Sequence, residues 1–328
     1  MILRIVSFFI LMLFVIPLCG CQKARFIFHE VKATSGNPKD QYEVARAYFE
    51  GKGIKESERK GLEWLKKSAA QEYPAAVLAL GLRYYSGDGV QVDDKEAMYY
   101  FQKAAKQDDN PTAKYFLGLG YLWGQGLPND YNQGIDWLKK AAEQGVSDAF
   151  VALGNAYYNG KAPFISQETA LRYYRKAADA GNSDGQFNLG YAYFNGIGIL
   201  QQKEAIKWFQ KSAEQGNSKA QQALGGAYYY GLGVPVDQET GVGWYRKAAE
   251  HGNPDAQYAL GSAYFFGGGV PKDPIEGLAW FILSNSAGDH QGICDLAAEE
   301  LGPESSQKAS LRAHAINKKI ISLLTKKE

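Results

Sequence analysis

The chain repeats the dipeptide Leu-Gly about every 36 residues, and this period constrains the possible folds more than any other feature. The six occurrences are Leu80-Gly81, Leu117-Gly118, Leu153-Gly154, Leu189-Gly190, Leu224-Gly225 and Leu260-Gly261. A Gly-x-Gly follows at a fixed offset in all but one unit, and a large aromatic residue keeps the same step from Trp64 to Trp280. Three marks in phase at this period predict a solenoid of stacked units, which usually presents a binding surface rather than a reaction chamber.

One unit extends from Ala113 to Asp148 and is typical of two antiparallel helices. In its first half, apolar or small residues recur at i, i+4, i+5 and i+8 from Ala113, on one face of a helix. Residues 124–126 end this helix, because glycine adopts the left-handed conformation at little cost. The second half, residues 132–143, carries a second apolar face. Gly118 lies in mid-helix, which predicts a close crossing of two backbones. Positions of the first helix are numbered below from Ala113 as position 1.

Seven such units are expected over residues 38–290, followed by capping helices in residues 291–328. The first unit has Val44-Ala45 in place of Leu-Gly. At the other end, residues 293–299 and 305–326 predict two helices that close the stack with a polar outer face. Residues 21–37 carry no repeat signal, so we expect a tether, from which Phe26 to Phe28 can dock on the first unit.

The pattern Ala-x-x-x-Leu-Gly-x-x-Tyr-x-x-Gly-x-Gly, followed by Ala/Gly-x-x-Trp/Tyr-x-x-Lys-Ala-Ala-x-x-Gly, resembles the Sel-1-like repeat, a relative of the tetratricopeptide repeat. Residues 220–252 carry nearly every consensus position. The resemblance implies an all-α, right-handed α/α superhelical solenoid of about seven helix-turn-helix repeats. The first helix of each repeat would line the concave side, and the protein would act as an adaptor or scaffold for other proteins.

Residues 1–20 are typical of a bacterial signal peptide. Arg4 supplies a positive charge, residues 5–18 are almost wholly apolar, and this run is too short for a membrane span. Residues 18–21 resemble the lipobox, which implies lipid on Cys21 and a membrane anchor. Ordinary signal cleavage nearby is the alternative and implies the same compartment. With Gln22 rather than Asp after Cys21, the resemblance implies an outer-membrane lipoprotein that faces the periplasm.

Composition and spacing argue against several other functions. The chain has 36 Lys+Arg and 35 Asp+Glu, a net charge of +1, which argues against a nucleic-acid partner because such a partner needs a basic stripe. The four histidines lack the spacing of metal ligands, so no metal or cofactor is expected. Cys294 is expected to be a small buried residue near the cap. An enzyme acting on the cell wall or on β-lactams is the weakest hypothesis, because no catalytic constellation is visible.

Positions 3, 7 and 10 of the first helix share a second face, which the family geometry places in the concave groove. Position 7 varies between units, from arginine in the first to serine in the last, which suggests tailoring to a ligand. Aromatic residues at position 10 have an alternative role, since they can pack between units. The residues expected to bind a partner, including some at position 11, are Tyr85, Tyr115, Trp123, Asn155, Tyr158, Tyr191, Phe194, Asn195, Tyr229, Tyr230 and Phe265.

The predicted function is therefore a non-catalytic, lipid-anchored scaffold that binds another protein through an aromatic groove. The alternative is an immunity protein that neutralises a secreted toxic effector, such as a type VI secretion lipase, in the periplasm. Adjacent genes would discriminate between these hypotheses. For the core, we expect the ring of Trp208 to be buried between repeats.

Overall fold

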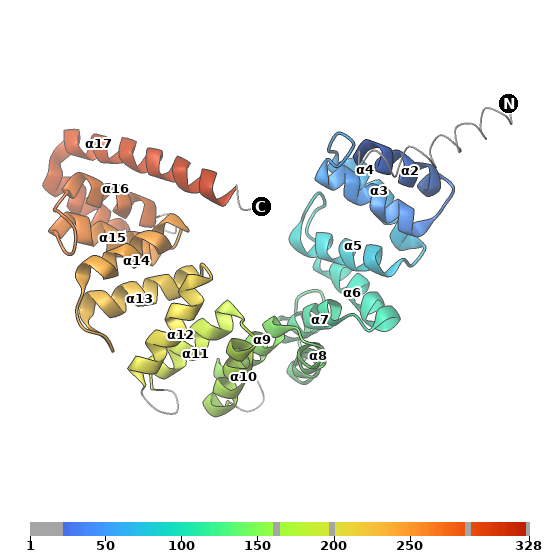
Figure 1. The fold of residues 1–328 in the computed structure, drawn as a ribbon, viewed down its shortest axis with the longest axis horizontal. Helices are drawn as coiled ribbons and strands as arrows, with labels where there is room; N and C mark the ends of the chain where they lie inside the picture. Colours follow the sequence, from blue (N-terminus) through green and yellow to red (C-terminus); the bar gives the residue numbers. More distant parts are fainter. Residues whose placement is uncertain (1–21, 160–164, 197–200, 286–289, 326–328) are drawn as a thin grey trace. The chain divides into compact units, whose positions relative to one another are not determined.

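The computed structural model describes residues 22–159, 165–196, 201–285 and 290–325, and all regular structure in these ranges is helical (Figure 1). The sixteen helices are α2 (Gln22–Thr34), α3 (Pro38–Glu50), α4 (Glu58–Ala70), α5 (Pro74–Ser86), α6 (Asp94–Asp108), α7 (Pro111–Trp123), α8 (Tyr131–Glu143), α9 (Ser147–Tyr158), α10 (Gln167–Asp179), α11 (Ser183–Phe194), α12 (Gln202–Glu214), α13 (Ser218–Tyr230), α14 (Gln238–Glu250), α15 (Pro254–Phe266), α16 (Pro274–Ser284) and α17 (Gln291–Leu324). The predicted all-α fold is confirmed. Helices α3 to α16 form seven successive pairs. From α2 to α8 and from α10 to α17, each helix packs on its neighbours in chain order, and α9 contacts α10 at Gly154.

Two compact units divide the chain, with their boundary inside α9. The first unit contains α2 to α8 and the residues of α9 up to Ala152, and the second contains the rest of α9 and α10 to α17. Within each unit the buried side chains form cores between neighbouring helices, so each unit is a stack of helix pairs.

Side-chain caps define where the helices begin. Asn110 accepts a hydrogen bond from the amide of Ala113, and asparagine caps α3, α11, α13 and α15 in the same way. The second helices of most repeats begin after Ser or Asp, as at Asp93 and Asp237. These caps satisfy amide groups that have no partner within the helix. The aspartates of the turns therefore have a structural role.

The glycine of each Leu-Gly pair lies where the two helices of a repeat cross. A Cβ atom on Gly118 would lie 2.6 Å from Cγ of Leu138, and one on Gly225 would lie 2.4 Å from the ring of Tyr245. In every pair the opposing side chain comes directly after the periodic aromatic residue. These side chains are Phe101, Leu138, Tyr174, Phe209, Tyr245 and Phe281. The predicted close crossing is confirmed.

From Trp64 to Trp244 the periodic aromatic residue borders the core instead of filling it, whereas Trp280, in the last repeat, is buried. Trp208 is only partly buried, whereas its neighbour Phe209 is 2% exposed. Nζ of Lys211 lies 4.2 Å from the ring centroid of Trp208, and a lysine three residues on lies over Trp64, Trp137 and Trp244 as well. The expectation for Trp208 is corrected here. Consecutive helical residues point about 100° apart, and Phe209 takes the direction of the core.

The second glycine of the Gly-x-Gly turn packs against the preceding repeat. Gly126 has a φ of 67°, and a Cβ atom on it would lie 2.1 Å from the carbonyl oxygen of Asp94, at the start of α6. Gly269 lies in the same way against Gln238, at the start of α14. The turn is thus a contact between repeats as well as a helix stop.

Residues 22–34, expected to belong to a tether, form helix α2 instead. This helix has the place of the second helix of a repeat. Gly53 approaches the backbone of Gln22 as Gly126 approaches Asp94. Nε2 of Gln41 donates to the carbonyl oxygen of Ala33 at 3.2 Å, and Gln221 and Gln257 make the same bond to the preceding helix.

The expected docking of this segment is confirmed for Phe26, which is 5% exposed and packs edge-on against Tyr48. A sequence signal for α2 exists in the tripeptide Gly36-Asn37-Pro38, which matches Gly252-Asn253-Pro254 between α14 and α15. Helix α2 is only half of a repeat, and a segment of this length is too short to be detected by its periodicity.

Helix α17 caps the other end of the second unit. Its continuity breaks at Gly302, with φ 76° and ψ 172°, directly before Pro303, so it consists of two helices as expected. Sγ of Cys294 is buried 3.1 Å from the carbonyl oxygen of Phe281, which confirms its expected place near the cap. Beyond the kink, Ala309, Ala313, Ile316 and Ile320 are buried against the stack. Arg312 binds Glu276 of α16 through Nε at 2.6 Å.

Candidate protein-binding face

The first helices of the second unit share a face without charged side chains. We define the uncharged face as positions 7, 10 and 11 of α9 and positions 3, 7, 10 and 11 of α11, α13 and α15. These residues are Asn155, Tyr158, Asn159, Phe187, Tyr191, Phe194, Asn195, Gln222, Gly226, Tyr229, Tyr230, Tyr258, Ser262, Phe265 and Phe266. Charged residues make up 22% of the whole chain, so this face departs from the average. Depletion of charge and enrichment of aromatic residues are typical of the core of a protein interface.

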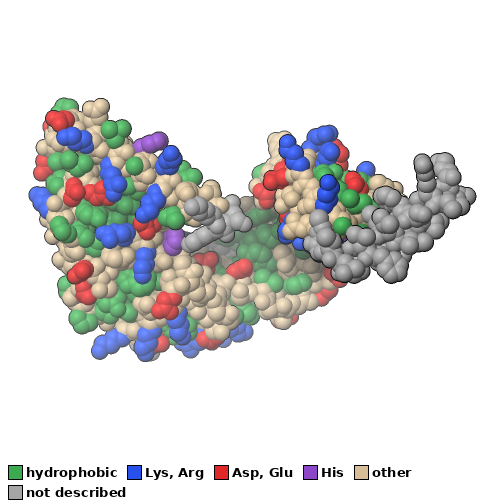
Figure 2. Space-filling model, turned by 45° about the horizontal axis from the view of Figure 1, so that its top comes forward, with side chains coloured by type: hydrophobic (Ala, Val, Ile, Leu, Met, Phe, Trp, Pro, Cys, Tyr) green, Lys and Arg blue, Asp and Glu red, His purple; other side chains and the backbone are tan. Residues whose placement is uncertain are grey.

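Three aromatic side chains of the uncharged face are well exposed. The exposed fractions are 46% for Tyr191, 66% for Tyr230 and 69% for Phe266. Phe266 was not among the predicted binding residues, although it has the same position 11 as Tyr230. Hydrophobic side chains also reach the surface between charged ones in Figure 2. These three rings are the candidate anchors for a partner.

Phe265 was predicted to bind a partner, and the structure contradicts this. The side chain is only 4% exposed and belongs to a core cluster with Cys294, Ala297 and Ala309 of α17. Its ring centroid lies 5.9 Å from that of Phe281. The capping helix covers position 10 of the last repeat, so this ring is unavailable to a partner.

The other aromatic residues at position 10 are half-buried between helices. Ring centroids are 6.4 Å apart for Tyr158 and Tyr174, and 6.1 Å for Phe194 and Phe209. Tyr229 packs on Tyr245 at 6.0 Å, and burial raises the pKa of its hydroxyl above the ordinary value. Packing between helices, the alternative role for position 10, therefore applies to these rings, each of which keeps part of its surface exposed.

In the first unit too, some of the predicted aromatic residues are half-buried and one is exposed. Tyr85 is half-buried against Phe116, with ring centroids 4.8 Å apart, and burial raises the pKa of its hydroxyl. Tyr115 lies edge-on to Phe116 at 5.2 Å. Trp123, at position 11, is 42% exposed. It is therefore the most accessible of the predicted aromatic residues in this unit.

The two asparagines predicted to bind a partner already make internal hydrogen bonds. The hydroxyl of Tyr174 donates to Oδ1 of Asn155 at 2.8 Å. Tyr174 is 4% exposed, and burial raises the pKa of its hydroxyl well above the ordinary value. Nδ2 of Asn195 donates to the carbonyl oxygen of Tyr191 at 2.9 Å. Asn155 thus already accepts a hydrogen bond from a buried hydroxyl within the second unit.

Replacing Asn155 by alanine is expected to lower the free energy of unfolding by about 1–3 kcal/mol, because the buried Tyr174 hydroxyl loses its acceptor. Adding Tyr174→Phe should recover part of this loss, since neither polar partner is then left alone. Urea unfolding of both single variants and the double variant measures the coupling. Strict additivity would show that this hydrogen bond does not contribute to stability.

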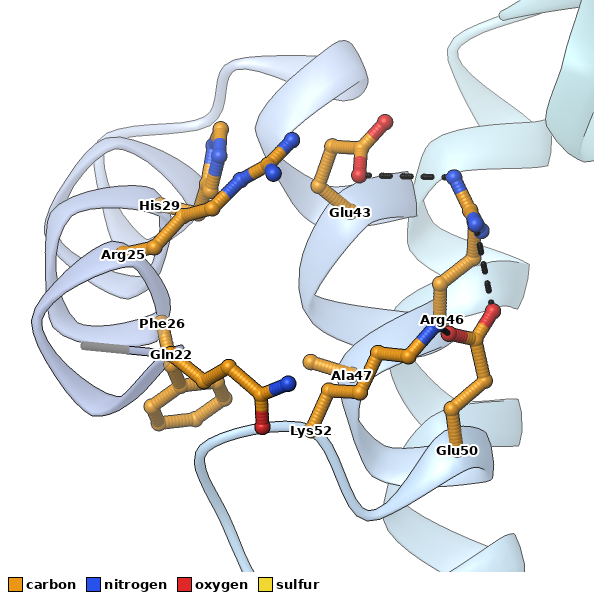
Figure 3. A pocket seen from close by; sticks show the side chains of 9 residues that line it. All are labelled: Gln22, Arg25, Phe26, His29, Glu43, Arg46, Ala47, Glu50 and Lys52. Carbon is orange, nitrogen blue, oxygen red and sulfur yellow. Dashed lines mark hydrogen bonds and ion pairs between the residues drawn. The ribbon is translucent and has the colours of Figure 1, made fainter. Parts of the chain in front are cut away.

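A cavity of about 290 Å³ lies between α2 and α3 in the first unit (Figure 3). Arg46 pairs with Glu50 at 3.1 Å and with Glu43 at 3.6 Å, as the dashed lines in Figure 3 show. At the rim, His29 binds Asp40 at 2.6 Å. Most charged side chains around this cavity are therefore paired with a side chain of opposite charge. Such pairing is typical of a solvated end of a helical stack.

Arg25, which also lines this cavity, identifies the end of the stack. Arg25 lies three residues before Phe28 of α2. Every later second helix has glycine or alanine at the corresponding place, three residues before its periodic aromatic residue. These residues are Gly61, Ala97, Gly134, Ala170, Ala205, Gly241 and Gly277. A Cβ atom on Gly134 would lie 3.0 Å from the carbonyl oxygen of Gly118, so the small residue permits the close crossing. An arginine there is incompatible with a tightly packed preceding helix and suits a capping element.

Metal sites and membrane spans are two other features that a helical protein can carry. Among residues 22–159, 165–196, 201–285 and 290–325, no group of three His, Cys, Asp or Glu side chains is arranged to hold a metal ion. In the same ranges, no helix combines the length and the apolar character needed to cross a bilayer.

Stacked antiparallel helix pairs with such a face define a helical-repeat binding protein. The Sel1 repeat matches seven consecutive segments, residues 38–73, 74–109, 111–146, 148–182, 183–217, 218–253 and 254–289. The chain belongs to the Sel1 repeat family, whose repeats are generally a non-catalytic protein-interaction fold.

Several solved structures are similar to this chain. A Sel1 repeat protein from Oxalobacter formigenes is 30% identical, with a TM-score of 0.68, over 84% of this chain and 80% of that one. The protein c5321, a protective antigen of uropathogenic Escherichia coli with an SLR fold, is 26% identical, with a TM-score of 0.43, over 95% and 84%. Immunity protein Pa5087 from Pseudomonas aeruginosa is 21% identical, with a TM-score of 0.44, over 65% and 81%. No curated protein matches the sequence.

Proposed function

We propose that this protein is a non-catalytic scaffold or adaptor that binds another protein through the uncharged face of its second unit. The observation that carries the proposal is the exposure of Tyr191, Tyr230 and Phe266 on a face without charged side chains. Tyrosine and other large aromatic side chains dominate binding energy at interfaces, because they bury much area at a low entropic cost.

Replacing Tyr191 and Tyr230 together by alanine is expected to weaken partner binding by about 2 kcal/mol or more, in the range of hot-spot losses. Both side chains are exposed, so the fold should be retained. A pull-down from envelope extracts supplies the partner, and calorimetry measures its affinity for each variant.

The matched control is Tyr99→Ala, because Tyr99 is 55% exposed on α6, a second helix of the first unit. This control should bind the partner like the unmodified chain. Full affinity in a folded Tyr191/Tyr230 double variant would mean that the partner uses another surface, and would overturn the assignment of the face.

We also propose that lipid on Cys21 anchors the protein in the bacterial outer membrane, facing the periplasm. Cys21 lies outside the described residues, and the support is the lipobox-like sequence of residues 18–21. Helix α2 begins at Gln22, directly after this cysteine. A lipid at Cys21 would therefore hold the first unit close to the membrane surface.

The anchor is tested by metabolic labelling with a fatty-acid analogue. Cys21→Ser should abolish the label and leave the protein unprocessed or mislocalised, because the sulfur atom is the proposed acceptor. Equal labelling of the variant and the unmodified chain would exclude Cys21 as the lipidation site.

An immunity role would use the same uncharged face to bind a secreted effector. The identity of the protein captured in the pull-down distinguishes the two roles, since a scaffold should retain envelope assembly proteins. A toxic effector encoded beside this gene would favour immunity.

A further inference from the structure

The net charge of +1 conceals a strongly basic segment at the end of the chain. Residues 305–327 contain six basic residues, Lys308, Arg312, Lys318, Lys319, Lys326 and Lys327, and no Asp or Glu. This segment contributes +6, so all other residues together contribute −5, because +6 − 5 gives the net charge of +1. The basic residues are thus concentrated in the second half of α17 and the residues that follow it.

The same part of α17 ends in exposed apolar side chains. Beyond the kink, one side of the helix is buried through Ala309, Ala313, Ile316 and Ile320. At the end of the helix, Ile321 is 54% exposed, Leu323 41% and Leu324 43%. We call residues 318–324, which begin with Lys318 and Lys319, the α17 tip. Figure 1 shows this end of α17 next to the C-terminal mark.

An apolar groove continues from the α17 tip onto α16. Its volume is about 550 Å³, and Ile282 and Leu283 of α16 line it together with Ile320, Ile321 and Leu324. Exposed apolar side chains at the end of a helix are unfavourable in water, at about 25 cal/mol per Å² of apolar area. A surface that covers this groove and also attracts lysine would remove that penalty.

We propose that the α17 tip docks on an anionic phospholipid surface. Ile321, Leu323 and Leu324 would enter the boundary between headgroups and acyl chains, and the lysines would bind lipid phosphates. A basic helix with exposed large apolar side chains is typical of interfacial binding. Lysine suits this place, because its stem can lie along apolar surface while the ammonium group stays among the headgroups.

Charge complementarity favours an anionic phospholipid surface as the partner of the α17 tip. The side chain of Lys319 is 69% exposed, and its ammonium group lies 3.4 Å from a carboxylate oxygen of Glu250. Lys318 is exposed and forms no ion pair within the described residues. No acidic residue within 305–327 opposes a negatively charged surface. The inference goes beyond the proposed function and does not depend on lipid at Cys21.

The experiment uses residues 22–328, which contain every described helix and lack both the apolar leader and Cys21. Co-sedimentation is measured with vesicles of phosphatidylcholine alone and with vesicles containing about one third phosphatidylglycerol. Binding should require the anionic lipid and should weaken as salt is added. Equal binding to both vesicles, or binding to neither, overturns the proposal.

Two variants test the two chemical components of the tip. Lys318→Glu should weaken binding roughly 25-fold, from about fivefold for each unit of charge removed. Ile321→Ser with Leu324→Ser should weaken it about tenfold or more by removing apolar insertion. Both variants alter exposed side chains, so circular dichroism melts should match those of the unmodified chain.

Matched controls alter similar side chains away from α17. Lys203→Glu reverses an exposed lysine on α12, and Leu232→Ser with Val236→Ser removes two exposed apolar side chains after α13. These controls should bind anionic vesicles like the unmodified chain. Equal losses in the controls and the tip variants would overturn the assignment. So would a dimer that the tip variants dissociate, because a second copy would then cover the tip.

Discussion

Replacing Phe209 by alanine is expected to lower the free energy of unfolding by about 3–5 kcal/mol, the range for removing a large buried aromatic side chain. Phe209 is 2% exposed and contacts α11 at Gly190, where a Cβ atom would lie only 2.8 Å from its ring. Glycine has no side chain that could move into the resulting cavity. Urea unfolding measures the change.

The neighbouring Trp208→Ala variant is the matched control. Trp208 is larger but only partly buried, and Lys211 covers its outer side. Its replacement should therefore lower the free energy of unfolding by less than half as much as Phe209→Ala. The reverse order would show that the periodic aromatic residue, and not the residue after it, forms the core between helices.

Gly126→Ala is expected to lower the free energy of unfolding by roughly 2–4 kcal/mol. About 1 kcal/mol comes from the left-handed backbone that a side chain disfavours, and a further 1–3 kcal/mol from forcing a methyl group into a filled space. That space is bounded by the carbonyl group of Asp94, which belongs to the backbone of α6 and cannot rotate away. Chemical denaturation of the whole chain measures the loss.

Gly145 offers a control for the backbone contribution alone. It has a φ of 90°, and a Cβ atom on it would meet nothing within 4 Å. Gly145→Ala should therefore lower the free energy of unfolding by only about 1 kcal/mol. The difference between the two variants measures the contact between repeats at Gly126, and equal losses would show that the turn does not lock one repeat to the next.

The fold of the repeats could be predicted because each local signal occurs several times in phase. The first helix of the best-defined unit ends at Trp123, directly before the predicted glycine stop, and its second helix ends at Glu143 as expected. Sequence periodicity could not distinguish Trp208 from Phe209, because both recur at the same step and both are aromatic. The two side chains differ in the direction in which they point from the helix. Which of these directions faces the core depends on where the partner helix lies.

The candidate site was less predictable, because it depends on what covers each repeat. Phe265 and Tyr229 have the same position in their units, yet only Phe265 is sealed, since the cap α17 packs on the last repeat. Asn155 was read as a ligand contact, but its partner Tyr174 comes from another helix. The net charge of the whole chain also concealed the basic end of α17, because a net charge does not show where along the chain the charged residues lie.

The arginine at position 25 has a consequence for how such a protein changes length during evolution. Duplication of a gene segment adds one complete repeat, whose two helices cross closely because the second helix has glycine or alanine at this place. Each second helix from α4 to α16 meets this condition. Helix α2 does not, because a first helix placed ahead of it would meet the long charged side chain of Arg25 where glycine or alanine is needed. Lineages should therefore gain or lose repeats in the interior of the stack, while α2 is inherited unchanged as its fixed end.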